Sequence, residues 1–225
     1  MAGLPPRRCG HPTPAEQGAR LHHRPRLAEP ARLASADHRT RAVSAARRRP
    51  GATPPPPTAT PASFRYDPAD PTPTVGGRLL SPDGGYRDDA SLARRADVLS
   101  FTGDPLTEDL CVHGNPVIEL AHSSDNPHVD VFVRISEVDA RARSRNVSDG
   151  YRRLTGGAGA VHLEMDAIAH RFRAGSRIRV LVAGGCHPRF ARNLGTGEPP
   201  VSGTELKPAT HVVRFGASRL VLPLA

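Results

Sequence analysis

The chain combines 225 residues with 24 prolines, no tryptophan, 37% hydrophobic residues and a formal net charge of +9 at pH 7. This composition is too rich in proline and too poor in apolar residues for a wholly folded chain, so we expect part of it to stay unfolded. No apolar run approaches the roughly 18 residues of a membrane span, and the first residues lack the apolar stretch of a secretory signal. We therefore expect neither a membrane partner nor export.

The three cysteines, Cys9, Cys111 and Cys186, are an odd number and show no CxxC spacing. They indicate neither a disulfide framework nor a zinc site. We expect a reducing, cytoplasmic setting, with no metal and no cofactor. No feature predicts an oligomeric state.

Residues 1–62 are expected to form a disordered, extended tail, because they are rich in arginine and proline and almost lack aromatic and β-branched residues. Residues 1–60 hold eleven arginines against three acidic residues, so +8 of the net charge of +9 lies there. Without aromatic residues or an amphipathic period, this charge predicts no specific nucleic-acid partner, and the alternative is a weak, salt-dependent association. The Arg/Pro/Ala/His mixture also resembles a GC-rich gene read out of frame, and we hypothesise a misassigned start.

Residues 63–96 are rich in turn formers and are expected to form an extended, ordered linker that lies on a neighbouring domain. The segment runs from Phe64 through two Asp-Pro pairs to the Gly76-Gly77 break and then to Pro82-Asp83-Gly84-Gly85.

Residues 97–225 change to short β-type runs separated by turn signals, which predicts half-buried strands. Turns are expected at Ser148-Asp149-Gly150 and at Gly156-Gly157-Ala158-Gly159, where the lack of a following lysine and helix argues against a phosphate loop. Eight runs and no amphipathic helix favour a β-sandwich or jelly roll. The expected strands are Val98–Thr102, Leu110–His113, Val117–Ala121, Val129–Ile135, Val161–Ile168, Ile178–Ala183, His211–Phe215 and Leu220–Leu224.

Several blocks, in this order and spacing, resemble the C-terminal domain of the cocaine-esterase/NonD and Xaa-Pro dipeptidyl-peptidase type serine hydrolases. The resemblance covers Tyr66 to Ala225 and implies an all-β, galactose-binding-like jelly roll that packs on an α/β-hydrolase catalytic domain. The blocks are Tyr66–Pro71 with Gly76-Gly77, Asp97–Thr102 with Pro105-Leu106, Asp109–Gly114, Asn146–Gly150, Phe172–Val180, Pro188–Asn193, Thr196-Gly197 and Leu220–Pro223.

In that family the Ser, Asp and His of the catalytic triad precede the matched stretch, so we expect no catalytic residue in this chain. No G-x-S-x-G elbow occurs, and Gly216-Ala217-Ser218 is expected to lie in a terminal hairpin, not in a strand-turn-helix context. Where the family's linker borders the substrate cleft, the matching residues are Leu79, Leu80 and Ser81. These residues either line the substrate cleft or only pack against neighbouring residues. We favour packing, because apolar loop residues are usually buried for packing alone.

Two polar clusters allow a functional and a structural interpretation. The first, His122-Ser123-Ser124-Asp125-Asn126-Pro127-His128-Val129-Asp130, has metal-ligand residue types, but its turn formers favour a loop between strands. Arg152 and Arg153 after Asp149-Gly150, with Arg189, Arg192 and Asn193, could contact an anion or sugar. For Arg189 and Asn193 we favour structural hydrogen bonds that satisfy buried backbone groups.

The sequence thus predicts a non-catalytic accessory domain of a serine hydrolase, a fragment that is inactive alone. The alternative is a stand-alone carbohydrate- or ligand-binding jelly-roll module, which would need exposed aromatic residues on a concave face.

Overall fold

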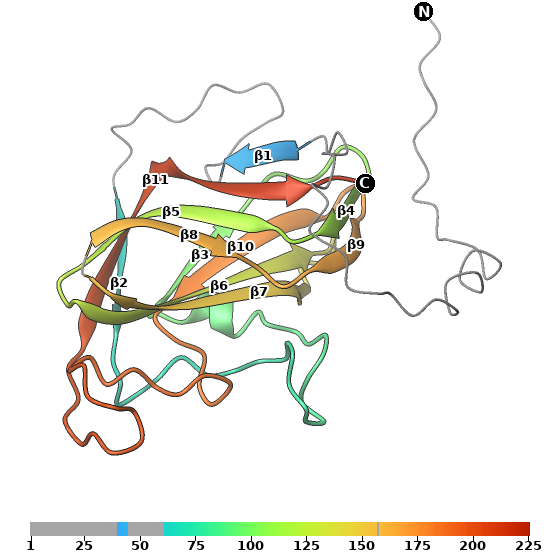
Figure 1. Cartoon of the computed structure of the whole chain (residues 1–225). Coiled ribbons are helices and arrows are strands. Elements are labelled where there is room, and N and C mark those ends of the chain that lie inside the picture. The colour runs from blue at the N-terminus through green and yellow to red at the C-terminus, as the bar shows by residue number, and fades with distance from the viewer. Residues whose placement is uncertain (1–39, 45–60, 157) are drawn as a thin grey trace, which may run out of the picture.

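The computed structural model describes residues 40–44, 61–156 and 158–225, and these residues form two antiparallel sheets packed face to face (Figure 1). The first sheet has the strand order β1-β11-β5-β8, with β2 also paired to β11. Its strands are β1 (Thr40–Ser44), β2 (Ala62–Tyr66), β5 (Val117–Ser124), β8 (Ala158–Glu164) and β11 (Ala209–Pro223).

The second sheet has the order β3-β10-β6-β7, and a short two-stranded sheet, β4-β9, lies beside it. A 3-10 turn over Leu92–Arg94 precedes β3. The strands are β3 (Val98–Thr102), β4 (Leu110–Gly114), β6 (His128–Val138), β7 (Ser144–Thr155), β9 (Ile168–Phe172) and β10 (Arg177–Ala183).

The main core lies between the two sheets and is built by alternate residues of each strand. In β5, Ile118 and Leu120 are buried, and they belong to the same apolar cluster as Val131 and Val133 of β6 and Val180 of β10. Burying one such side chain stabilises the fold by about 1.5–3 kcal/mol. The alternating pattern therefore places one face of every central strand against the opposite sheet.

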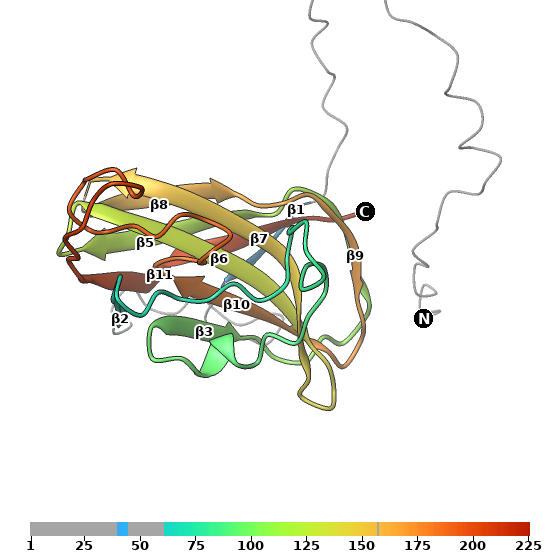
Figure 2. The ribbon, with the colours of Figure 1, turned by 90° about the horizontal axis from the view of Figure 1, so that it is seen from below.

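The outer face of the four-stranded sheet is also buried. The even-numbered residues of β6 point away from the main core, yet Phe132 and Arg134 are almost inaccessible to solvent. The segment that follows β2 and the loop after β10 cover them, and Leu92 and Cys186 join Phe132 in a second apolar cluster. Figure 2 shows the segment after β2 running along this side of the molecule.

Residues 63–96, expected to be an extended linker, are bound to the sandwich itself. Phe64 and Tyr66 of β2 are buried in the main core, and β2 pairs with residues 209–213 of β11. Further along, the backbone around Thr72 and Thr74 exchanges hydrogen bonds with His187. The segment thus forms one folded body with residues 97–225.

The expected all-β sandwich is confirmed, and the strand limits show where a local pattern misleads. Ser148-Asp149-Gly150 is not a turn but lies inside β7, because Asp149 is paired in register with Arg134 of β6. The run Val161–Ile168 divides into β8 and β9, which belong to different sheets.

The expected terminal hairpin at Gly216-Ala217-Ser218 is instead a bulge inside the single strand β11. The pairing of β11 with β5 shifts between Arg214 and Arg219. The Ser218 hydroxyl donates to the Arg214 carbonyl (2.8 Å) and accepts from the Ala121 amide (3.0 Å), so it bridges the extra residues. A bulge of this kind bends a strand without ending it.

The structure describes only Thr40–Ser44 and Pro61–Ala62 of the tail expected to be disordered, and Thr40–Ser44 form β1, antiparallel to residues 219–223 of β11. The rest of the tail, including the hypothesised misassigned start, lies outside the described residues. Within the described part, no helix is long and apolar enough to cross a lipid bilayer.

Candidate functional site: a projecting loop held on a buried charge network

Residues 77–85 form a loop that is closed at its base by two backbone hydrogen bonds. The Gly77 amide donates to the Gly85 carbonyl and the Gly85 amide donates back to Gly77, both at 2.8 Å. Gly77 has a φ of +85°, and a Cβ at this position would lie 2.5 Å from Asp149 Oδ2. Only glycine fits here, because the backbone is left-handed and touches a side chain of β7.

The tip of this loop carries the three residues that the resemblance placed at the substrate cleft. Leu80 has a relative exposure of 111%, so none of the residues that the structure describes covers its side chain. Leu79 is half-buried, and Ser81 is exposed, with its Oγ accepting from the Asp83 amide at 3.1 Å. Leu80 therefore does not pack against the described residues, although packing was the expected role. Tyr86, next to the base of the loop, is exposed as well.

The base of the loop rests on Arg134 of β6, whose side chain has no solvent exposure. Its Nε and Nη2 donate to the two carboxylate oxygens of Asp149 at 2.7 and 3.0 Å, and its Nη1 donates to the Val75 carbonyl at 2.6 Å. Burial lowers the pKa of Arg134, but the Asp149 carboxylate outweighs this effect and leaves the pKa above its usual value. The guanidinium thus remains charged and fixes the backbone just before the loop.

The same network continues outward to the loop and to the neighbouring loop after β10. Arg189 donates to Asp149 Oδ2 (2.5 Å) and to Asp166 Oδ2 (3.3 Å), and Arg78 of the projecting loop donates to Asp166 Oδ1 (2.7 Å). Asp89 lies 3.8 Å from Arg134 and accepts from the Ser136 hydroxyl. Each buried charge has an opposite charge beside it, as burial requires.

A second network, centred on Asp130 of β6, holds the loop after β10. Asp130 accepts from the Tyr151 hydroxyl (2.7 Å), from Arg153 (2.9 and 3.0 Å) and from the Asn193 amide (2.8 Å). Burial, followed by the Asp130 carboxylate, raises the pKa of Tyr151, so this hydroxyl stays protonated and donates. Arg153 also donates to the Ala191 carbonyl at 2.7 Å.

Arg189 and Asn193 both make hydrogen bonds within the domain. Asn193 satisfies a buried backbone group, the Gly195 amide, as predicted, whereas the Arg189 guanidinium binds the carboxylates of Asp149 and Asp166 and not the backbone. The guanidinium of Arg153 binds the Asp130 carboxylate, which occupies the position that an external anion would take. Arg152 donates to the His162 carbonyl. Arg192 donates to the Pro68 carbonyl at 3.0 Å and so binds the loop to the segment after β2.

The cluster around His122 is dispersed by the fold. His122 points inward from β5, where its Nε2 lies 3.0 Å from His211 Nδ1, whereas Asp125 accepts from the Thr210 amide and Asp130 faces the outer network. In the described ranges no three His, Cys, Asp or Glu side chains are grouped closely enough for a metal ion. The cluster thus serves the turn between β5 and β6 and the core beside it.

The Cys186 thiol and several serine hydroxyls are held in contacts within the domain. Burial raises the pKa of the Cys186 thiol, which keeps it protonated. Buried serine hydroxyls donate hydrogen bonds to backbone carbonyls: Ser148 donates to the Asp166 carbonyl and Ser176 donates to the Arg173 carbonyl. None of the hydrogen bonds of the described residues joins a serine to a histidine, which an acyl-transfer triad would require.

Two apolar side chains of the loop after β10 are also exposed: Val201 at 98% and Leu206 at 40%. Figure 1 shows this orange-red loop and the teal-green projecting loop extending from the same side of the sandwich, below the sheets. The two loops lie at opposite ends of this side in Figures 1 and 2, so their exposed apolar residues do not form one continuous patch.

Sequence reasoning missed the charged centre of this site. The signal was present in β6, where polar residues at positions 130, 134 and 136 alternate with valines and isoleucine. This alternation normally marks a solvent-facing side. Only the covering segments, which come from distant parts of the chain, turn that side into a buried network.

Comparisons with known proteins agree with the resemblance seen in the sequence. A family described as the X-Pro dipeptidyl-peptidase C-terminal non-catalytic domain matches residues 28–220. The cocaine esterase of Rhodococcus sp. (strain MB1 Bresler) is 31% identical over an alignment of 150 residues, and the match covers 60% of this chain and 26% of that protein.

Two solved structures share the fold. An alpha-amino acid ester hydrolase has a TM-score of 0.65 at 22% identity, and an aminopeptidase from a marine sediment Thaumarchaeota archaeon has a TM-score of 0.61 at 23% identity. Each match covers 74% of this chain and 33% of the other. The chain thus spans about a quarter to a third of the length of these relatives, and it belongs to the family of the X-Pro dipeptidyl-peptidase C-terminal non-catalytic domain.

Proposed function

We propose that this chain docks on the α/β-hydrolase catalytic domain of a serine hydrolase and helps to shape its substrate cleft, while having no hydrolase activity alone. The observation that carries the proposal is Leu80, a large apolar side chain fully exposed at the tip of a loop whose base is rigidly closed. Single exposed apolar residues are common on protein surfaces, so it is the combination of full exposure with a base closed by two backbone hydrogen bonds that supports docking. A partner surface that covers Leu80 would remove this apolar side chain from water and so stabilise the complex.

The charge network supports the same proposal. Arg134 is buried beneath the loop and Arg78 ties the loop itself to Asp166, so both restrict its movement. A loop that is already ordered loses less conformational entropy on binding, which favours docking. Leu79 and Ser81 flank the tip, and we propose that they accompany Leu80 at the border of the cleft.

The relatives' names suggest ester or amide hydrolysis for the complete enzyme. The cocaine esterase and the alpha-amino acid ester hydrolase are named for esters, and the archaeal protein is named an aminopeptidase. We assign the choice of substrate to the catalytic domain, because that domain carries the reacting groups. The carbohydrate-binding alternative gains no support, since Tyr86 is the one large aromatic side chain that is exposed among those whose exposure is described.

A chimera tests the proposal: this chain replaces the matched C-terminal portion of the cocaine esterase, and ester hydrolysis and thermal stability are measured. Covering Leu80 contributes about 1.5–3 kcal/mol, so Leu80→Ser should raise KM or lower the unfolding temperature of the chimera. The matched control is Arg65→Ser, which alters an exposed residue of β2. Equal behaviour of the two variants would contradict docking through Leu80, and labelling of the isolated chain by a fluorophosphonate would contradict its inactivity.

A further inference from the structure

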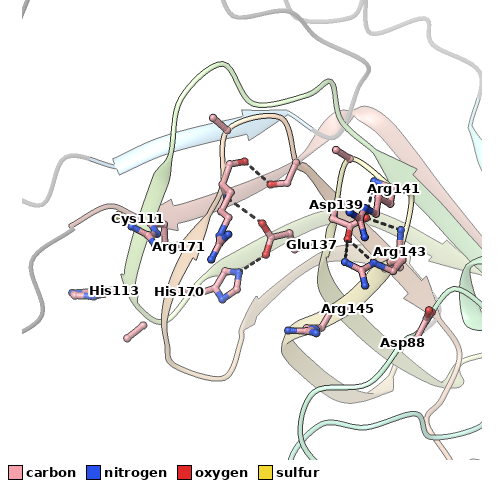
Figure 3. A pocket seen from close by; sticks show the side chains of 16 residues that line it. Asp88, Cys111, His113, Glu137, Asp139, Arg141, Arg143, Arg145, His170 and Arg171 are labelled. Atoms are coloured by element: carbon pink, nitrogen blue, oxygen red, sulfur yellow. Dashed lines mark hydrogen bonds and ion pairs between the residues drawn. The ribbon is translucent and has the colours of Figure 1, made fainter. Parts of the chain in front are cut away.

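An open groove of about 1100 Å³ lies between the two-stranded sheet β4-β9 and the β6-β7 hairpin (Figure 3). Sites for small molecules usually enclose about 300–1,000 Å³ and are mostly apolar. This groove is open and lies at the upper end of that range, and half of its lining residues are charged. Its size and polarity suit a chain-like ligand better than a compact small molecule.

Arginines stand on both sides of the groove, as Figure 3 shows for those it labels. The described carboxylates do not neutralise all of these arginines. Asp139 is paired with Arg143 at 2.7 Å. Glu137 accepts from the backbone amide of Arg173 and lies opposite the His170 ring, both at 3.0 Å. The arginines that line the groove are Arg141, Arg143 and Arg145 on one wall and Arg171 and Arg173 on the other.

Three of these guanidinium groups, those of Arg141, Arg145 and Arg173, have no carboxylate within ion-pair distance in the part of the chain that the structure describes. Arg171 has only Asp109, at 3.9 Å. The groove therefore offers several free, exposed guanidinium forks, which match the geometry of carboxylate groups.

Ser144 is an unusual polar residue beside the arginines. It lines the groove at the start of β7, its relative exposure is 1%, and its hydroxyl has no hydrogen-bond partner among the described residues. Buried hydroxyl groups are nearly always hydrogen-bonded, so Ser144 is an unsatisfied polar group next to the groove, although its burial keeps the hydroxyl out of the open space.

The spacing of the arginines indicates the shape of the ligand. Arg143 and Arg145 are two residues apart where β7 begins, and Arg171 and Arg173 are two residues apart where β9 ends. Two residues of extended chain span about 6.6 Å, which is also the repeat of side chains on one side of an extended peptide. We propose that the groove binds an extended peptide segment of a partner protein that carries acidic residues at alternate positions.

Other occupants fit less well. Single-stranded nucleic acid has a similar charge repeat, but its binding sites stack bases on Phe, Tyr or Trp, and none of these residues lines the groove. The arginine-rich segment 1–60 of this chain has the wrong sign of charge, because it carries +8.

The test measures fluorescence anisotropy of a labelled peptide of alternating glutamate and serine with the full chain. A peptide with glutamine in place of glutamate and a single-stranded oligonucleotide form the comparison arms. Removing three exposed charge contacts in the triple variant R145Q/R171Q/R173Q should weaken binding about tenfold. The control triple variant R65Q/R94Q/R214Q removes the same charge from exposed positions elsewhere and should change binding by less than about twofold.

Hydrogen exchange on the unmodified chain locates the peptide without any substitution. Protection of residues 141–145 and 171–173 is expected. Equal weakening by both triple variants, protection confined to residues 1–60, equal binding of the glutamine peptide, or tighter binding of the oligonucleotide in the same groove would each overturn the proposal.

Discussion

Lowering the pH from 8 to 5 should destabilise this domain through a histidine pair buried in the main core. His211 has no solvent exposure, its ring stacks on Phe64 with centroids 4.5 Å apart, and its Nδ1 lies 3.0 Å from His122 Nε2. Burial first, and then the neighbouring His122, lower the pKa of His211 to about 3, while Asp125 opposes this shift. Burial also lowers the pKa of His122.

The sign and size of the effect follow from proton binding. At pH 5 the unfolded chain binds a proton at His211, whose unfolded pKa is about 6.5, whereas the folded chain does not. Stability is therefore complete above pH 6.5 and falls as the pH drops toward 3. Between pH 6.5 and pH 5 the loss from His211 is about 2 kcal/mol, since each pH unit contributes about 1.4 kcal/mol. His122 adds a loss of the same sign.

Urea unfolding at pH 8 and pH 5, followed by circular dichroism, measures this loss. The double variant His122→Leu/His211→Leu removes both titrating groups and should flatten the dependence on pH over this interval. His162→Gln serves as the control, because the His162 side chain is 67% exposed. An unchanged pH dependence in the double variant would refute the reasoning.

Two further predictions concern the outer face of the four-stranded sheet. Arg134→Met should cost about 3–5 kcal/mol in the free energy of unfolding, because it leaves the buried Asp149 carboxylate without its partner, whereas Arg78→Met at the exposed end of the same network should cost less than about 1 kcal/mol. Urea unfolding compares the two, and similar losses would contradict the assigned roles. Cys186 should react with iodoacetamide about a hundredfold more slowly in the native chain than in urea, because its thiol is buried and protonated. Peptide mass spectrometry follows this residue alone, and equal rates would show that the loop after β10 opens readily.

The strand positions were largely predictable, because local alternation reports which side of a strand is buried. The predicted limits of β3, Val98–Thr102, match the structure, and β10 differs by one residue at its start. β7 was not predicted. Its Ser148-Asp149-Gly150 sequence has the composition of a turn, and its place in a strand depends on Arg134 of the neighbouring strand.

The candidate site was predictable only in part. The resemblance directed attention to Leu79, Leu80 and Ser81, but the sequence gives no measure of whether Leu80 is covered by its own domain. Its exposure depends on the closed base of the loop and on Arg134 beneath it. The arginine groove had no local signal at all, because its walls come from two separate pairs of strands.

The sequence by itself determined the all-β class, the family and the basic character of the first segment, since hydrophobic alternation, ordered blocks and charge are properties of neighbouring residues. Tertiary structure decided which polar residues are buried as partners, which apolar residues remain exposed, and which arginines face one another across a groove. The physical reason is that the burial and pairing of a side chain depend on segments far away in the chain. Arg134 is a surface residue in the pattern of β6 and a fully buried cation once the segment after β2 and the loop after β10 cover it.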